Sequence, residues 1–187
     1  MTTQTNSQHF ARGHGSVTVV TRKGRKVHIR HIQPADAALL IDLFHHLSPE
    51  TRRFRFFTAL PDLPDDILWR EARRYADFNE RKQAAFIALA RENGEEHAVG
   101  VVRLVLDKND PDTAEFAIVL RDDYQREGLG TMMLDLLIQL ALVRGIKRLR
   151  GISLADNEGV HRLIQKCGFP VESHTSHGET TQIIHLE

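Results

Sequence analysis

Cysteine is almost missing from this sequence: Cys167 is the single one among 187 residues, so an internal disulfide is excluded. An excess of charge of one sign is also missing, because 25 basic and 25 acidic residues give a formal net charge of +0. This balance removes the general electrostatic argument for a nucleic acid or an anionic membrane as partner. The most apolar run, residues 136–143, falls far short of the ~20 residues that span a bilayer.

The N-terminus also lacks the features of a secretory signal, since residues 1–16 contain no apolar core and no cleavage-site pattern. Together with the single cysteine, this predicts a cytoplasmic protein. A hydrophobic content of 41% and a charged content of 27% are typical of a soluble globular domain. We expect residues 1–15, which are polar, to form a flexible arm and residues 16–187 to form one domain.

The first half of the domain carries clear start signals for a hairpin and three helices. Residues 17–32 alternate between apolar and polar side chains and are broken at Lys23-Gly24, which predicts a β-hairpin. Pro34 and Pro64 each stand where a helix can begin, and Ser48 has the chemistry of an N-cap. Trp69, on the third of these helices, is expected in the core.

The second half begins with three short apolar runs, residues 84–90, 97–106 and 113–120, separated by turn-rich segments. They predict an antiparallel meander. A long apolar helix over residues 129–144 and a strand over residues 146–154 follow. A short helix capped by Asp156 or Asn157 comes next, and the chain ends in a strand. The overall prediction is an α/β (α+β) fold.

The stretch YQREGLGTMM, residues 124–133, joins the last strand of the meander to the long helix. Gly128 and Gly130 keep side chains away from the helix N-terminus, where unsatisfied N–H groups and the helix dipole favour an anion. Such a junction can hold a phosphate or pyrophosphate. The alternative is that the two glycines only make a tight turn and allow close packing of the helix.

Side chains around these glycines add possible donors. Gln125 and Arg126 precede them, and Thr131 follows with a hydroxyl group. No lysine follows Gly130, so the loop is not a P-loop, and it does not read G-x-G-x-x-G either. The nucleotide-binding motifs with those two patterns are therefore disfavoured.

The pattern Gln-x-x-Gly-x-Gly, between a strand and a helix, resembles the acyl-CoA site of the GNAT superfamily of N-acetyltransferases. Further along, DNEGVHRLIQKCGF resembles the superfamily's Asn-led helix, which ends in Lys-x-Gly-Phe. The matching residues of this second motif are Asn157, Lys166, Gly168 and Phe169.

Several longer segments, including LSPETRRFRFF and AEFAIVLRDDYQREGLG, resemble the GNAT domain of bacterial Pat-type protein lysine acetyltransferases. The similarity runs from about Val17 to the end of the chain. In that family the domain is often fused to an acyl-CoA synthetase-like or cyclic-nucleotide-binding region, and we find neither pattern here.

The resemblance implies a GNAT fold, in which a mixed, mostly antiparallel sheet is splayed at its central strands and flanked by helices. It also implies that the strand before the loop is bulged, that pantetheine lies in the splay, and that acetyl-CoA is the cosubstrate without a metal. The implied cofactor-binding residues are Ile118, Val119, Leu120, Gln125, Arg126, Gly128, Leu129, Gly130, Thr131 and Asn157.

Glu127 departs from the family pattern, because the position before the first loop glycine is usually basic or small. A carboxylate beside a pyrophosphate is repulsive unless it points to solvent. We therefore expect a weaker affinity for CoA, with Arg126 as the compensating charge.

Glu115 is the candidate general base. Acetyl transfer needs a neutral amine, so a lysine with a pKa near ~10.4 must lose a proton in the site. Glu115 lies in the AEFA setting where the Pat-type family places its proposed catalytic glutamate, and a lone carboxylate in an apolar strand is suited to this role. The alternative is a glutamate on the solvent face of a half-buried strand.

The leaving-group side lacks a residue that many superfamily members have. Ile164 occupies the position of their tyrosine, which protonates the thiolate. For this step the resemblance therefore supplies no acid, and water is the remaining proton source. A backbone N–H near Val119 or Leu120 is the candidate donor to the oxyanion. Cys167 is expected to pack in the core rather than to act as a nucleophile.

Other groups of residues give weaker evidence for a functional site. The eleven histidines show no convincing ligand set: His174 and His177, for example, fall in a predicted polar loop without a third ligand. The basic residues 22–26 are expected to form a solvated hairpin tip. Residues 50–57, ETRRFRFF, are expected to form an amphipathic helix with Phe inward, and the alternative is that they line an acceptor groove.

The sequence therefore predicts an acetyl-CoA-dependent N-acetyltransferase whose acceptor, by resemblance, is a protein lysine. Two alternatives remain: a small-amine acetyltransferase, and a catalytically silent acyl-CoA-binding sensor, suggested by Glu127 and Ile164. We expect neither nucleic acid nor membrane as a partner, and the sequence leaves a homodimer open.

Overall fold

The computed structural model describes residues 15–58 and 63–187. The predicted arm at residues 1–15 therefore lies, apart from Gly15, outside the described residues. Within the described part, eight strands form one sheet in the order β1-β2-β3-β4-β5-β6-β8-β7. The strands are β1 (Ser16–Val20), β2 (Lys26–His31), β3 (Gln83–Glu92), β4 (Glu95–Leu106), β5 (Thr113–Leu120), β6 (Arg148–Leu154), β7 (Val171–Ser176) and β8 (Glu179–His185).

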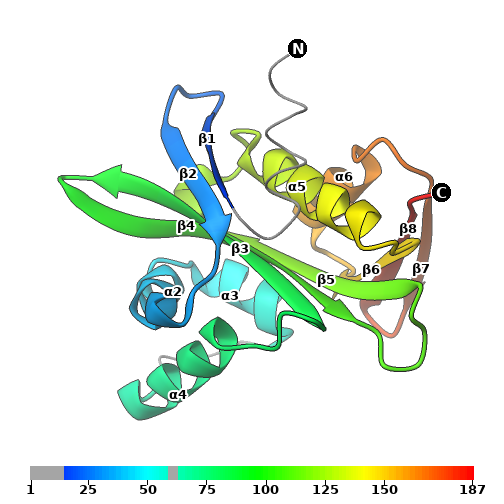
Figure 1. Ribbon diagram of the computed structural model, residues 1–187, viewed down its shortest axis with the longest axis horizontal. Coiled ribbons are helices and arrows are strands. Elements are labelled where there is room, and N and C mark those ends of the chain that lie inside the picture. The colour runs from blue at the N-terminus through cyan, green and yellow to red at the C-terminus, as the bar shows by residue number, and fades with distance from the viewer. Residues whose placement is uncertain (1–14, 59–62) are drawn as a thin grey trace.

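Helices cover both faces of this sheet (Figure 1). Helices α5 and α6 lie on one face, and α2, α3 and α4 lie on the other. Two short 3-10 turns, η1 and η2, precede α2 and the glycine loop. The bounds are η1 (Pro34–Asp36), α2 (Ala37–His45), α3 (Pro49–Phe56), α4 (Asp65–Ala76), η2 (Asp122–Tyr124), α5 (Leu129–Val143) and α6 (Glu158–Gln165).

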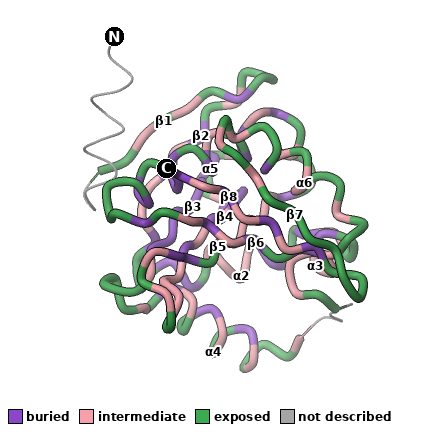
Figure 2. Tube along the Cα trace, turned by 90° about the vertical axis from the view of Figure 1, so that its right-hand side faces the viewer, coloured by how far each residue is buried: buried purple, intermediate pink, exposed green. Residues whose placement is uncertain are grey.

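Two hydrophobic cores result, one on each face of β3. Phe86 and Ala88 join the core that contains α5, whereas Ile87 and Leu89 join the core under α2 and α4. A strand that is buried on both faces needs a continuous apolar run, and residues 84–90 provide it. Figure 2 shows buried segments along the strands in the middle of the sheet.

The sheet is splayed between β5 and β6. These parallel strands pair only from Thr113 with Arg148 to Phe116 with Gly151, although both strands continue beyond that point. A Cβ atom on Gly151 would come within 2.9 Å of the Phe116 ring, so the glycine makes room for this ring where the strands part. The predicted splay is present and lies directly before the glycine loop.

The bulge lies on a different strand from the one expected. The pairing of β3 with β4 shifts between Ala88 with Gly100 and Leu89 with Ala98, which leaves Val99 as an extra residue on β4. The pairing of β4 with β5 runs without a shift. The carbonyl of Val99 accepts a hydrogen bond from the backbone N–H of Arg121 at 2.9 Å, so the bulge fixes the end of β5.

The predicted hairpin, helices and meander are present, and two other expectations were wrong. The polar segment that contains His174 forms β7, an edge strand. Nearly all of its residues are exposed (green in Figure 2), so its sequence has no apolar and polar alternation that predicts a strand. Trp69 is 40% exposed on α4 rather than in the core. Its ring packs against the guanidinium of Arg73, 5.4 Å from the ring centroid.

Among the described helices, none has the length and apolar character needed to cross a bilayer.

Candidate active site

The glycine loop presents a row of free backbone donors. Arg126 and Gly128 have positive φ angles of 60° and 86°, so the chain turns sharply before α5 begins at Leu129. The N–H groups of residues 126–131 donate no hydrogen bond to another described residue. Consecutive free N–H groups at the start of a 15-residue helix form a concave site that favours an anion.

Gly130 has a packing role as well. It is buried, and a Cβ atom there would lie 3.3 Å from Cδ1 of Leu120 and 3.5 Å from Cδ2 of Leu163. The absence of a side chain therefore lets α5 approach the end of β5 and helix α6. The binding interpretation of the glycines and the packing alternative are both compatible with this geometry.

Gln125 does not offer its side chain to a ligand in this structure. Its Nε2 donates to the carbonyl of Leu120 at 3.2 Å and to Oγ1 of Thr51 at 3.2 Å. The expected role as a phosphate donor is replaced by a structural one, in which the amide ties the loop to β5 and α3. Arg126 and Thr131 are exposed beside the free N–H groups, where the sequence predicted them.

Glu127 points away from the anion site and is buried, with 1% of its side chain exposed. Its carboxylate accepts hydrogen bonds from Nε and Nη2 of Arg25 and from Oγ1 of Thr21, and it pairs with Nζ of Lys23 at 3.0 Å. The hydrogen bond from Arg25, helped by those from Lys23 and Thr21, lowers the pKa of Glu127 to about 2.

The partners of Glu127 thus come from the β1–β2 hairpin, which lies against the glycine loop. The expected repulsion of a pyrophosphate assumed that the charge of Glu127 has no partner. The expectation that Arg126 compensates this charge was wrong, because Arg25 and Lys23 pair with the carboxylate instead. The basic hairpin tip is not merely solvated either, since the backbone N–H of Arg22 donates to the carbonyl of Glu127 at 2.9 Å.

The splay exposes backbone groups of alternate residues on β5. The N–H of Arg121 bonds to Val99, and the carbonyl of Thr113 accepts from Asp107, so odd-numbered residues face β4. By this alternation Val119 points to β4, whereas Ile118 and Leu120 direct their N–H and C=O groups toward the gap beyond the paired part of β6.

A small cavity of about 50 Å³ marks this gap, with Ile118 on one wall and Gly151 on the other. Asn157 lines it from the start of α6, and its Oδ1 caps that helix by accepting from the N–H of Val160 at 3.2 Å. Ile164, also on the wall, is buried, and Cys167 packs near its helix end with its thiol 3.9 Å from the carbonyl of Phe169.

Helix α3 lies at the open end of the splay, where hydrogen bonds and an ion pair hold it to the segments after β5 and β6. Asp122, just after β5, accepts hydrogen bonds from the N–H and Oγ of Ser48 and from Oγ1 of Thr51 at 2.7–2.8 Å. Burial opposes ionisation, but these hydrogen bonds hold the pKa of Asp122 below its usual range. Arg53 pairs with Asp156, after β6, at 2.6 Å. The helix therefore bridges the ends of both diverging strands.

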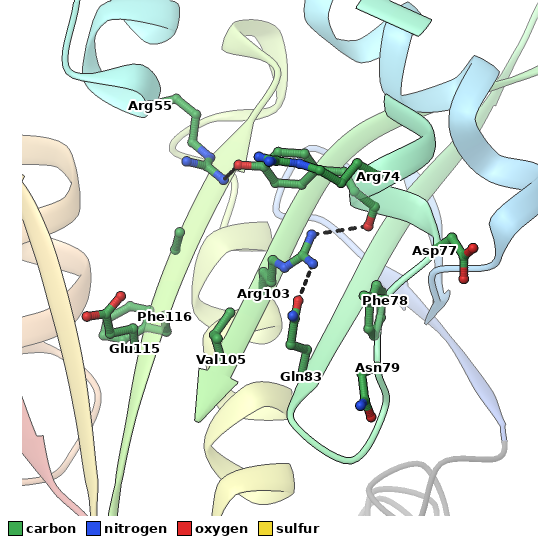
Figure 3. A pocket seen from close by; sticks show the side chains of 12 residues that line it. Arg55, Arg74, Asp77, Phe78, Asn79, Gln83, Arg103, Val105, Glu115 and Phe116 are labelled. Atoms are coloured by element: carbon green, nitrogen blue, oxygen red, sulfur yellow. Dashed lines mark hydrogen bonds between the residues drawn. The ribbon is translucent and has the colours of Figure 1, made fainter. Parts of the chain in front are cut away.

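Glu115 lines a second, larger cleft of about 620 Å³ on the α3 and α4 side of the sheet (Figure 3). Its side chain is 52% exposed, and Oε1 accepts a hydrogen bond from Nη2 of Arg150 at 2.5 Å. Arg150 also pairs with Asp107 at 2.7 Å. The expectation of a lone carboxylate in apolar surroundings was wrong, because the parallel register places Arg150 directly opposite Glu115.

The sequence did not single out the residues that build the rest of this cleft. Arg103 of β4 lines it, together with Tyr75 and Phe78. Arg103, a charged residue within the apolar run of β4, was the sequence feature that could have indicated this cleft. Arg55 of α3 also lines the cleft, which favours the alternative that residues 50–57 border a groove, although Phe56 packs inward against Phe44 at 5.9 Å.

No group of three or more metal-ligating side chains gathers anywhere in residues 15–58 and 63–187. The free N–H groups and the unpaired edge of β5 are backbone donors and acceptors, which suit a phosphate and an amide chain rather than a cation. The residues present therefore fit acetyl-CoA, with its pyrophosphate and pantetheine amides.

Comparison with known proteins agrees with this geometry. Residues 26–170 match the family described as Acetyltransferase (GNAT) domain. The chain is 30% identical over 166 residues to the protein named Acetyltransferase PA5475 of Pseudomonas aeruginosa, a match that covers 87% of this chain and 83% of that protein. It is 24% identical over 152 residues to Acetyltransferase Pat of Mycolicibacterium smegmatis, covering 81% of this chain but only 44% of that longer relative.

Among solved structures, the GNAT domain of S. lividans PAT superposes with a TM-score of 0.78. The match covers 91% of this chain and 96% of that domain at 21% identity. This likeness establishes the fold and confirms the predicted mixed, mostly antiparallel sheet. Together with the family match over most of the sequence, it means that the chain belongs to the GNAT family of acetyl-CoA-dependent N-acetyltransferases.

Proposed function

We propose that residues 16–187 form a catalytic domain that transfers the acetyl group of acetyl-CoA to a protein lysine, with Glu115 as general base. The observation that carries this proposal is the position of Glu115. It lies in an open cleft, one residue before the pairing of β5 with β6 ends at Phe116. The choice of a protein acceptor follows from the resemblance to the Pat-type protein lysine acetyltransferases, and a relative named Acetyltransferase Pat is among the matches.

The cofactor side is built from the loop and the splay. The free N–H groups of residues 126–131 bind the pyrophosphate, with Arg126 and Thr131 at the rim. Ile118 and the N–H of Leu120 pair with the pantetheine amides, and Asn157 borders the same gap. Gln125 and Val119 contribute by holding this edge of β5 in place. Acetyl-CoA supplies the acetyl group as a thioester.

The acceptor side depends on Glu115. Its Oε1 is held by Arg150, while Oε2 has no partner among the described residues and remains able to accept a proton. A lysine ammonium that reaches the cleft gives up a proton to this oxygen, directly or through a water. The lone pair of the amine then forms the N–C bond, the C–S bond breaks, and the nitrogen loses its second proton to solvent as the amide forms. Arg150 keeps the carboxylate at the cleft and is a positioning residue.

The backbone also serves the transition state. The N–H groups of Ile118 and Leu120 face the gap, so one of them is the donor for the carbonyl oxygen as it gains negative charge. Ile164 has no proton to give, and the departing sulfur takes one from solvent. This assignment replaces Val119, whose N–H faces β4.

The test is a Glu115→Gln variant measured with two readouts. Acetyl-CoA at ~100 times its dissociation constant should stabilise wild type and variant alike, by ~2.7 kcal/mol in the free energy of unfolding. Acetylation of a lysine peptide should fall by about 10²–10⁴ in kcat, because the general base is lost. Glu95→Gln, on the distant β3–β4 hairpin, is the matched control and should keep full activity.

An unchanged kcat in the Glu115→Gln variant would remove Glu115 from this role. Stabilisation by acetyl-CoA without turnover of any amine by the wild type would contradict the proposed enzyme and favour a sensor that only binds the acyl-CoA. Turnover of small amines but of no peptide would favour a small-amine acetyltransferase.

A further inference from the structure

The cleft beside Glu115 gathers three arginines from three different elements: Arg55 of α3, Arg74 of α4 and Arg103 of β4 (Figure 3). They are separate in sequence, and the tertiary fold brings their charges to one cavity of about 620 Å³. Glu115 lines the same cavity, so an acceptor bound there lies close to these charges.

Arg103 is the most firmly held of the three. Its guanidinium lies between two rings, 4.7 Å from the centroid of Tyr75 and 4.9 Å from that of Phe78. It donates to the carbonyl of Tyr75 at 3.1 Å and to Oε1 of Gln83. Both acceptors are neutral, and no ion pair of the described residues includes Arg103, so this partly buried cation lacks a carboxylate partner there.

The neighbouring charges do not neutralise this cation. Burial, together with the charges of Arg55 and Arg74, lowers the pKa of Arg103. Arg55 donates to the hydroxyl of Tyr75 at 3.5 Å and lies 5.9 Å from the centroid of that ring. Arg74 pairs with Glu71 at 3.3 Å, so that Arg55 and Arg103 are the two without a carboxylate partner among the described residues.

The acidic lining residues are Asp77 and Glu115; Glu115 is paired with Arg150, and no ion pair of the described residues joins Asp77 to Arg103. Further N–H donors of these guanidinium groups remain available, and planar arginine forks are suited to a carboxylate.

The register fixes how far the backbone positions of Arg103 and Glu115 lie from each other. Arg103 is opposite Ala117, and Val105 is opposite Glu115, so Arg103 and Glu115 are diagonal neighbours on one face of the sheet. The Cα atoms of such diagonal neighbours are roughly 7–8 Å apart, and the guanidinium of Arg103 extends toward β3, where it bonds to Gln83. An extended peptide advances about 3.3 Å per residue, so two positions along it span a similar distance.

We propose that the acceptor is a lysine with an acidic side chain within about two positions, and that Arg55, Arg74 and Arg103 bind this acidic group while Glu115 receives the lysine. This inference rests on the proposed function and specifies its substrate class. It makes the arginines specificity-determining residues that position the acceptor, and not members of the reacting group.

The experiment compares short peptides that share a central lysine and differ only in the flanking residues, which are aspartate, asparagine or arginine. We expect kcat/KM to be at least about tenfold higher for the aspartate peptides than for the arginine peptides. One hydrogen bond to a charged group is strong enough to change the rate by this factor. The Arg55→Glu/Arg74→Glu double variant should reverse that order. Both residues line the cleft, and neither is a hydrogen-bond partner of Arg103.

Arg91→Glu is the matched control, because Arg91 lies on the exposed β3–β4 hairpin and bonds to the carbonyl of Gly94. The control variant should keep the wild-type order of peptides. Free lysine, which carries its own carboxylate, is a further arm of the same assay.

Equal rates for all peptides, or an order that the double variant leaves unchanged, would overturn the specificity while leaving lysine acetylation intact. A preference for free lysine over every peptide would also overturn it. If no amine is acetylated although acetyl-CoA binds, the proposed function itself fails, and the inference fails with it.

Discussion

Replacing Glu127 with glutamine removes a buried carboxylate that joins the β1–β2 hairpin to the glycine loop. A carboxyl with a pKa of about 2 in the folded protein and 4.5 outside it contributes roughly 3 kcal/mol to the free energy of unfolding at neutral pH. Glu127→Gln should lose most of this. In a chain of this length the loss corresponds to a fall in Tm of roughly 6–12 °C.

The dependence on pH has a definite sign. Because folding lowers the pKa of Glu127, its contribution is complete above the unfolded value of 4.5 and disappears as the pH falls toward 2. The difference in stability between wild type and variant should therefore be largest at neutral pH and about half as large near pH 3. Urea denaturation at several pH values measures this difference.

Glu158→Gln is the matched control, since Glu158 is a 75% exposed partner of Arg162 on α6. Such surface pairs contribute at most about 1 kcal/mol. The structural reasoning would be refuted if Glu127→Gln cost no more than this control. It would also be refuted if the variant bound acetyl-CoA more tightly, because that result would mean that Glu127 repels the pyrophosphate, as the sequence alone suggested.

Two further substitutions test how the splay is built. Ser48→Ala removes the N-cap of α3 and a partner of Asp122, and should lower the free energy of unfolding by about 1 kcal/mol in urea denaturation; no loss would mean that α3 is held by other contacts. Gly151→Ala places a methyl group 2.9 Å from the Phe116 ring and should cost about 1–3 kcal/mol and weaken acetyl-CoA binding measured by calorimetry. A fully stable variant with normal binding would show that the ring moves freely.

The elements with local chemical signals could be predicted from the sequence. Pro34 and Pro64 stand at helix starts, and Ser48 caps α3 by accepting from the N–H of Thr51 at 3.1 Å, as its residue type indicated. The glycine loop was recognisable because a free helix N-terminus is a property of a few consecutive residues. In contrast, β7 escaped detection because an exposed edge strand such as this one needs no apolar alternation.

The candidate site was predictable only in part. Glu115 was identified by its setting in one strand, but its partner Arg150 comes from another strand through the parallel register, which no local pattern encodes. The direction of the Gln125 side chain and that of Glu127 likewise depend on neighbours distant in sequence, Thr51 and Arg25.

The sequence by itself determined the order of strands and helices apart from β7, the family and the place of the glycine loop, because each depends on residue types within short windows. Tertiary structure alone decided which charges meet. It turned Glu127 from an expected repulsive neighbour into a buried anchor of the hairpin, and it placed Arg55, Arg74 and Arg103 around one cleft. Electrostatic energy depends on the distance between charges in space, and that distance is set only when the chain has folded.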